Sequence, residues 1–225
     1  MPDTKFSWRG LREHLRKYFW IYLLGVALCL VGTNLLWTMT RPQFSNEEVV
    51  TVYLADSYTY ADALSDVAAD MLERTRPFDE KLKDVRFESL MFNEQEYTSR
   101  MLLLTRLAVG EGDAFLASAA AMDALTTSEA LEPLDQYVAD GWLAEYGLEP
   151  YYFTTEDEET GEKTTWLAGL RLDGVKALLE RGAFNNEGAF LCVAANGGNV
   201  DTTMKALETM MRDLTEVQDA GAKAD

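Results

Sequence analysis

Histidine and cysteine are almost absent from this chain, which has one histidine, His14, and two cysteines, Cys29 and Cys192, among its 225 residues. Transition-metal sites are built mainly from cysteine and histidine side chains, and the common hydrolase triads use histidine as the base. The P-loop, G-x-S-x-G and C-x-x-C motifs are also missing. The sequence therefore predicts a protein that is not an enzyme, with no catalytic residues, no metal ligands and no cofactor.

Charged residues are missing from Tyr18 to Thr40, whose sequence is YFWIYLLGVALCLVGTNLLWTMT. A helix of about 20 apolar residues spans the hydrocarbon core of a bilayer, so we expect residues 18–40 to be a transmembrane anchor. Asp3 and Glu13 are the acidic residues before this stretch, and the basic ones are Lys5, Arg9, Arg12, Arg16 and Lys17. Because positive charge stays in the cytoplasm, residues 1–17 are predicted to be a cytoplasmic basic N-terminus and the chain after Arg41 to lie outside the membrane.

A cleaved signal peptide and a buried core helix are the alternatives to an anchor. A cleavable signal has an apolar core of about 7–15 residues and a small-residue cleavage site, whereas this stretch is longer and residues 35–39 offer no such pattern. Its length and the flanking charges argue against a core helix. Because Leu28 precedes Cys29 and the apolar run continues past it, we interpret Cys29 as a membrane-facing residue rather than a lipid attachment site.

Positive charge is scarce after the anchor. Residues 1–41 carry six Lys or Arg and two Asp or Glu, a net charge of +4, and the remainder carries 14 and 36, a net charge of −22. Nucleic-acid binding depends on basic patches that contact phosphates, so no nucleic-acid partner is expected. Cys29 in the membrane cannot pair with Cys192, and an exported domain without a disulfide favours a bacterial cell membrane.

The remaining chain has the length of one domain, which we place at residues 49–217, after a linker at 41–48 and before a disordered tail at 218–225. Apolar runs predict strands at 49–56, 85–92, 113–118, 166–172 and 189–196. Helical spacing predicts helices at 57–74, 93–109, 119–125, 173–180 and 200–217, and a short one within 131–143. Asn93 with Glu96, and Asp173, are predicted helix caps.

This alternation predicts an α/β fold, a three-layer α/β/α single lobe preceded by one transmembrane helix. The segment 154–165 has Thr-rich arms around Thr160-Gly161, which is typical of an exposed β-hairpin. We therefore expect a mostly parallel sheet with one antiparallel strand near Trp166.

Four groups of residues carry a likeness to a known family. The domain opens with VVTVYLAD at 49–56, and it closes with AFLCVAANGGNVDTTMKALETMMRDL at 189–214. Between them lie two motif groups, Leu103, Leu107, Ala108, Gly110, Gly112 and Asp113, and then Leu131, Pro133, Leu134 and Asp135. This order resembles the N-terminal lobe of extracellular solute-binding proteins of the sugar-binding, ABC-transporter type, over residues 49–216.

The resemblance implies a membrane-anchored, extracytoplasmic and non-enzymatic module that binds a small polar solute or sugar, or that assists a membrane transporter or another membrane protein. Two departures limit it: the family's second lobe has no counterpart here, and a membrane helix replaces the usual lipid anchor. A single open face buries little of a ligand's surface. The alternative is a structural or protein-interaction module that has the fold and binds no solute.

Ligands of open α/β sheets bind outside the carboxyl ends of the strands. The candidate ligand-binding residues at these predicted ends are Asp56, Ser57, Tyr58, Asn93, Ser118, Asn196 and Asn199. For Ser57, Asn93, Ser118 and Asn199 the alternative is helix capping.

Two other clusters have weaker interpretations. The aromatic residues Trp142, Tyr146, Tyr151 and Tyr152 suit either sugar stacking or a small core beneath a loop, and we favour the core. The acidic run at 156–159 suits a solvated hairpin tip better than a Ca²⁺ site, because its spacing matches no known calcium loop.

Overall fold

The computed structural model describes residues 8–40, 44–128, 130–138, 146, 148–156, 161–173, 175–184 and 188–222. The chain divides into two compact units, Met1–Gln43 and Phe44–Asp225. Each unit is described by itself below.

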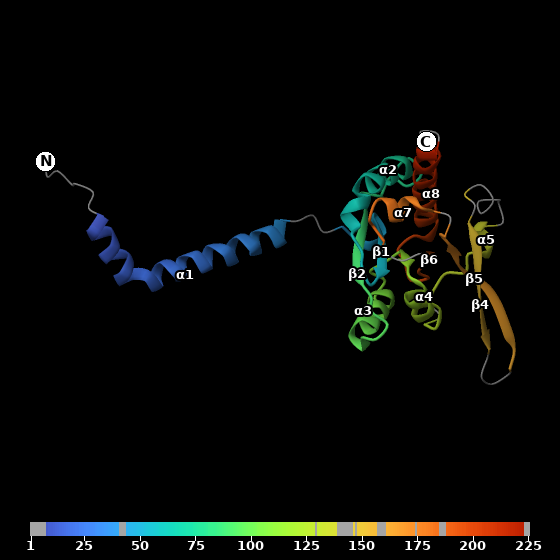
Figure 1. Cartoon of the computed structure of the whole chain (residues 1–225), viewed down its shortest axis with the longest axis horizontal. Helices are drawn as coiled ribbons and strands as arrows, with labels where there is room; N and C mark the ends of the chain where they lie inside the picture. The colour runs from blue at the N-terminus through green and yellow to red at the C-terminus, as the bar shows by residue number, and fades with distance from the viewer. Residues whose placement is uncertain are drawn as a thin grey trace. The chain divides into compact units, whose positions relative to one another are not determined.

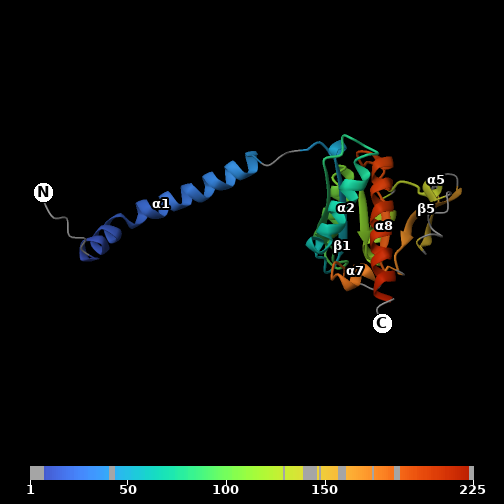
Figure 2. The same ribbon diagram turned by 90° about the horizontal axis from the view of Figure 1, so that it is seen from above.

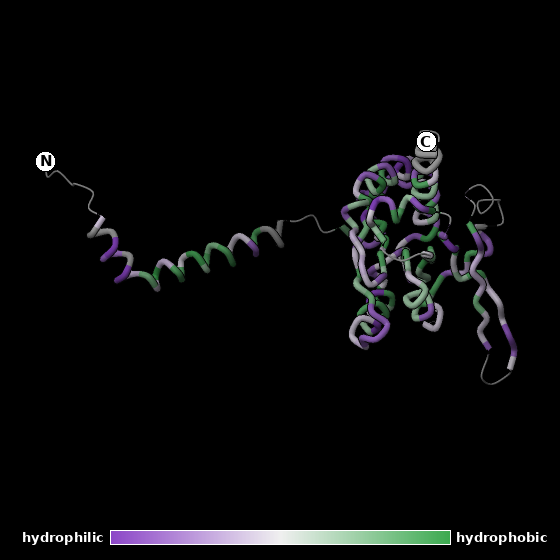
Figure 3. The backbone as a smooth tube through the Cα atoms, viewed as in Figure 1, coloured by the Kyte–Doolittle hydropathy of each residue, from purple (hydrophilic) through white to green (hydrophobic). Residues whose placement is uncertain are grey.

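The first unit contains one helix, α1 (Trp8–Thr40), drawn in blue in Figure 1. Its segment Arg16–Leu36 is long and apolar enough to cross a membrane, and Figure 3 shows the change along the helix from hydrophilic to hydrophobic residues. Tyr18 has non-helical dihedral angles, with φ −111° and ψ 16°. The helix is therefore interrupted at the residue where the predicted anchor begins.

The second unit is a mixed α/β domain with a six-stranded sheet in the order β2-β1-β3-β6-β5-β4. The strands are β1 (Val49–Asp56), β2 (Asp84–Met91), β3 (Ala114–Ala117), β4 (Glu149–Glu156), β5 (Lys163–Arg171) and β6 (Phe190–Val193). The helices are η1 (Asn46–Glu48), η2 (Ala61–Leu64), α2 (Ser65–Thr75), α3 (Tyr97–Ala108), α4 (Ala119–Thr126), α5 (Asp135–Val138), α7 (Ala177–Glu180) and α8 (Val200–Ala222).

The strand directions correct the prediction of one antiparallel strand. The β1–β2 and β1–β3 pairs are parallel, whereas β3–β6, β6–β5 and β5–β4 are antiparallel. Strands β4 and β6 thus both run against β1, whereas β5, which carries Trp166, runs in the same direction as β1, so the predicted antiparallel strand is the wrong one. The sheet has a parallel half and an antiparallel half. The apolar run of β6 is buried in either direction, and between β5 and β6 the described chain has only the four-residue helix α7 instead of a long crossover helix.

Two hydrophobic clusters form on opposite sides of the strands. Val52 and Leu54 of β1 pack in the first cluster with residues of α2, α7 and α8, such as Met71 and Met210. Tyr53 and Ala55 point to the other side and join residues of α3 and α4 in the second cluster. Helices α2 and α8 lie side by side, as Figure 2 shows. Because both sides are covered, β1 is buried along its whole length.

Most predicted elements are present, with shifted ends. The chain after β1 forms η2 and α2 instead of one helix from residue 57, and α8 continues past residue 217 to Ala222. The predicted linker is shorter, because Phe44–Glu48 belongs to the second unit. The predicted caps Asn93 and Asp173 are wrong: α3 begins after Glu96, α7 begins after Lys176, and neither of these N-cap residues makes a side-chain cap.

Candidate functional site

The carboxyl ends of β1, β2 and β3 meet at one edge, as the parallel half requires, and carry five of the predicted site residues. Asp56 is 1% exposed and accepts hydrogen bonds from the Ser57 backbone N–H (2.6 Å) and hydroxyl (3.3 Å). Ser118 is also buried, and its Oγ accepts from the Ala121 N–H (3.4 Å) at the start of α4. The capping interpretation of Ser118 is confirmed.

Ser57, Tyr58 and Asn93 are the exposed members of these five residues. The Asn93 side-chain oxygen accepts from the Gln95 N–H (3.1 Å), which makes a local turn before α3. Tyr58 is 56% exposed. Tyr60, which follows β1, Met91 at the end of β2 and Tyr97 at the start of α3 are also more than half exposed. This carboxyl edge therefore displays three tyrosines and a methionine to solvent, beside exposed polar residues such as Ser57 and Asn93.

The last two predicted residues, Asn196 and Asn199, lie at the opposite edge, because β6 runs antiparallel to β3. The Asn199 side chain accepts from the Thr202 N–H (3.2 Å), so it caps α8, and it donates to Asp79 (3.4 Å). The expectation that all seven residues gather at one edge is thus wrong for this pair. The capping interpretation is confirmed for Asn199.

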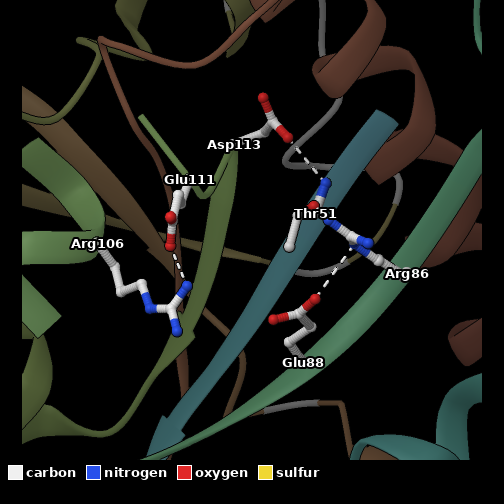
Figure 4. A network of polar contacts seen from close by, with 6 residues as sticks. All are labelled: Thr51, Arg86, Glu88, Arg106, Glu111 and Asp113. Atoms are coloured by element: carbon white, nitrogen blue, oxygen red, sulfur yellow. Dashed lines mark hydrogen bonds and ion pairs between the residues drawn. The ribbon is translucent and has the colours of Figure 1, made fainter. Parts of the chain in front are cut away.

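A charged hollow of about 230 Å³ lies at the other end of the parallel half, over β1 and β2. It is lined by Phe44, Ser45, Asn46, Val49, Thr51, Tyr53, Arg86, Glu88, Arg106, Gly110, Glu111 and Asp113. Figure 4 shows six of its polar members, which come from β1, β2, the end of α3 and the segment that leads into β3. The hollow is largely polar and includes two arginines and three carboxylates.

Each arginine of the hollow already has a carboxylate partner. Arg86 on β2 donates its Nε–H to the Thr51 hydroxyl (3.2 Å) and pairs with Glu88 two residues along the strand (3.2 Å). Arg106, near the end of α3, pairs with Glu111, and its guanidinium lies 6.0 Å from the centre of the Tyr53 ring. Burial first, and then the negative charge of Glu88, raise the pKa of Tyr53 to about 12, so its hydroxyl is neutral.

Asp113 joins three segments beneath the hollow. It is 6% exposed and accepts hydrogen bonds from the backbone N–H of Thr51 (2.8 Å) and of Gly198 (3.0 Å). Burial raises its pKa, and the two hydrogen bonds and the charge of Arg86 oppose that rise. Its carboxylate is therefore committed to holding β1, β3 and the start of α8 together.

The two glycines before Asp113 allow this close packing. Gly110 has a φ of +66°, and a Cβ there would lie 2.8 Å from the carbonyl oxygen of Asn196. A Cβ on Gly112 would lie 2.6 Å from the Tyr53 ring. The motif Gly110, Gly112 and Asp113, which carries much of the family resemblance, thus forms one wall of the hollow.

The chemistry of the hollow is that of its charged side chains. Its twelve lining residues include no cysteine or histidine, and the Thr51 hydroxyl already accepts a hydrogen bond from Arg86. Within the described part of the chain, no group of three or more His, Cys, Asp or Glu side chains is placed to hold a metal ion.

Sequence reasoning did not find the hollow, although one signal was present. Arg86 and Glu88 alternate with apolar residues in a predicted buried strand, and both face the same side of the sheet. Their convergence with Arg106 and Asp113 depends on the pairing of β1 with β2 and β3, which no local pattern specifies.

The structure describes part of the aromatic cluster and part of the acidic run. Tyr146 packs against the first hydrophobic cluster and Tyr151 against the second, as a core requires, whereas Tyr152 is 57% exposed. Trp142 and residues 157–159 of the acidic run lie outside the described residues.

No family model, curated protein or solved structure matches this chain. The resemblance to a solute-binding lobe therefore rests on the sequence motifs given above. Any function has to be argued from the geometry of the site.

Proposed function

We propose that this protein is a membrane-anchored, non-enzymatic binding module that holds a small polar solute in the charged hollow between Arg86 and Arg106. The observation that carries this proposal is the convergence of two guanidinium groups and two neighbouring carboxylates, Glu88 and Glu111, on one hollow of about 230 Å³. Ligand sites are concave and fix their ligands through a few convergent polar groups.

The size and charges of the hollow limit which solutes can fit it. Drug-sized ligands occupy cavities of about 300–1,000 Å³, so this smaller hollow suits a compact molecule. A solute with both an anionic and a cationic group matches it best, because the guanidinium groups attract one end and the carboxylates attract the other. Sugars, which carry neither charge, are the weaker candidates.

The proposal also covers the place of the protein in the membrane and the three-layer arrangement of its domain. Helix α1 is the single-pass anchor with its basic end in the cytoplasm, and the domain lies on the outer surface of a bacterial membrane. The two hydrophobic clusters on opposite sides of β1 support the three-layer interpretation of the domain. A neighbouring transporter or other membrane protein is the expected partner.

Calorimetry and thermal shift of the full chain in detergent, against a panel of amino acids, small anions and sugars, test solute binding. We expect one compact charged solute to raise the melting temperature and Arg106→Ala to abolish the response. Arg100→Ala is the matched control, because Arg100 lies on the same helix, is exposed and is not among the lining residues. No response to any compound by the folded protein contradicts the proposal.

Labelling tests the orientation. A membrane-impermeant maleimide on intact cells should modify Asn93→Cys in a Cys29→Ser background, since Asn93 is exposed and Cys192 is buried. Modification only after the cells are opened would place the domain in the cytoplasm.

A protein-interaction module is the second candidate, and the carboxyl edge favours it. Exposed apolar patches mark protein contacts, and Tyr58, Tyr60, Met91 and Tyr97 are each more than half exposed there. A photo-crosslinker at Tyr97 should then capture one dominant membrane protein, and the compound panel should give no response.

A further inference from the structure

Among the strands that the structure describes, β2 ends the sheet on the parallel side and pairs with β1 alone. The Phe92 N–H, one residue past β2, donates to the Asp56 carbonyl (2.8 Å), so the backbone groups of Phe92 face β1. Because backbone groups alternate along a strand, those of Val85, Phe87 and Ser89 point away from β1. An outer edge of this kind is a template for another strand.

The other terminal strand of the sheet, β4, is poorly suited to this role. It contains Pro150, which has no backbone N–H to donate. Strand β2 has eight residues and no proline. Of the two sheet edges, only β2 therefore combines length with a full set of donors.

The charges of β2 are complementary to a second copy of β2 in one register. Arg86 and Glu88 stand on either side of Phe87, face the same side of the sheet and pair with each other within one chain (3.2 Å), with side chains 44% and 39% exposed, so each remains open to a second partner. In an antiparallel pair centred on Phe87, Arg86 of each copy stands directly opposite Glu88 of the other. This register also places the outward backbone groups of Val85, Phe87 and Ser89 in hydrogen-bonded pairs.

The opposite side of the sheet offers room for the second copy. A groove of about 340 Å³ runs between β2 and helix α2, and its strand side is formed by Asp84–Phe87. The α2 side consists mainly of small residues, Ala61, Ser65, Ala68 and Ala69, together with Asp62 and Leu72. Small side chains leave space along this groove for a side chain of the second copy.

We propose that two copies of this chain associate through their β2 strands, paired antiparallel around Phe87. Two Arg86–Glu88 ion pairs form on one side of the joined sheet, and the two Phe87 rings enter the groove on the other side. Opposite charges directly across a strand pair are stabilising and like charges are destabilising. Anchoring both copies in one membrane raises their effective concentration, so a modest interface suffices.

Charge exchange tests the register directly. The full chain in detergent micelles is examined by sedimentation with three samples: Arg86→Glu, Glu88→Arg, and an equal mixture of the two variants. Each variant alone places like charges opposite one another, and we expect its dimer to weaken about tenfold or more. The mixture restores opposite charges only across the two chains, so we expect its dimer to return to wild-type strength.

A symmetric crosslink provides an independent readout. In a Cys29→Ser background, Phe87→Cys should form an oxidative dimer, because position 87 faces itself across the two-fold axis. Met91→Cys is the matched control: Met91 is 71% exposed, but its copies would be separated by about 27 Å, eight residues at the strand rise.

Several results would contradict the pairing of two β2 strands. A wild-type chain that is monomeric at every concentration overturns the proposal, as do single variants that dimerise as well as the wild type. A mixture no better than either variant shows that the charges do not meet across the strands, and it also overturns the register.

Discussion

The two halves of the sheet hold their strands in different ways. In the parallel half, β1 and β3 are buried along their full length, and Asp113 joins β1, β3 and the start of α8 beneath the charged hollow. In the antiparallel half, β4 alternates between exposed and partly buried residues, and β5 forms ladder pairs with β6 at Leu170 and Arg171. The far part of the β4–β5 hairpin therefore depends on its own ladder.

The two halves therefore differ in how much their polar contacts contribute to stability. The parallel half pairs its polar groups inside, where an unpaired group is costly, and the hairpin keeps its charges in water, where a partner adds little. Equivalent substitutions in the two halves should therefore have unequal effects.

Asp113→Ala should have the largest effect. Its removal leaves the buried N–H group of Thr51 and the partly buried N–H group of Gly198 without their charged acceptor, so we expect the free energy of unfolding to fall by about 3–5 kcal/mol. Chemical denaturation of the full chain in detergent, followed by circular dichroism, measures it. Asp113→Asn keeps one acceptor oxygen and should lose roughly half as much; a loss below about 1 kcal/mol for the alanine variant would show that Asp113 does not join these segments.

A pair of glycines tests the close packing beside the hollow. Gly110 and Gly161, one in each half, have φ values of +66° and +68°, but only a Cβ on Gly110 meets another atom, at 2.8 Å. Gly161→Ala should cost about 1–2 kcal/mol from the left-handed backbone alone. Gly110→Ala should cost about 1–3 kcal/mol more, from the contact with Asn196. Equal melting temperatures for the two variants would contradict the contact.

The stability of the protein should depend on pH through the ionisation of Asp213. This residue lies on α8, the helix that packs beside α2. Burial and the neighbouring carboxyl of Asp70 raise the pKa of Asp213 to about 6. Because an aspartate in the unfolded chain ionises near 3.9, the folded state binds a proton more tightly. The stabilisation of the folded state by this proton is fully present below about pH 4 and is lost as the pH rises through about 6.

Asp213→Asn keeps this side chain neutral at every pH. We expect the variant to gain up to about 1 kcal/mol over the wild type at about pH 7.5, since solvent screens the partly exposed pair, and to gain nothing below about pH 4. Melting temperatures across this range measure the difference. Asp201→Asn, on the same helix, controls for the loss of a negative charge, and parallel pH profiles for Asp213→Asn and the wild type would refute the raised pKa.

The hairpin should show the smallest effect. Glu156 pairs with Lys163 near the turn (3.2 Å), and the two side chains are 59% and 66% exposed. Glu156→Gln should change the free energy of unfolding by less than about 0.5 kcal/mol, because exposed ion pairs contribute little. A loss as large as that of Gly110→Ala would mean that the hairpin is not held mainly by its ladder.

The parallel half was the more predictable part of the fold. The strand at 49–56 was predicted with its observed ends, because a continuous run of apolar and β-branched residues is typical of a strand buried on both faces. The hairpin was also predicted from its turn and its Thr-rich arms. The caps were less predictable: Ser118 and Asn199 cap helices, whereas Asn93 forms a turn four residues before α3 begins.

The site was predicted only in part. The rule that ligands bind at carboxyl strand ends directed attention to Asp56 and Asn93, which do lie at one edge. It misplaced Asn196 and Asn199, because the direction of β6 was unknown. Arg86, Arg106 and Glu111 were passed over, since nothing in their local sequence indicates that a β-strand and a helix end converge.

The sequence by itself determined the uncharged apolar segment from Tyr18 to Thr40, the buried strands and the acidic character of the domain, because each depends on the kind and spacing of neighbouring residues. The tertiary structure alone decided the direction of β6 and the meeting of Arg86, Arg106 and Asp113 around one hollow. An apolar run has the same periodicity in either direction, and a site drawn from β1, β2, α3 and the start of β3 exists only after those elements pair.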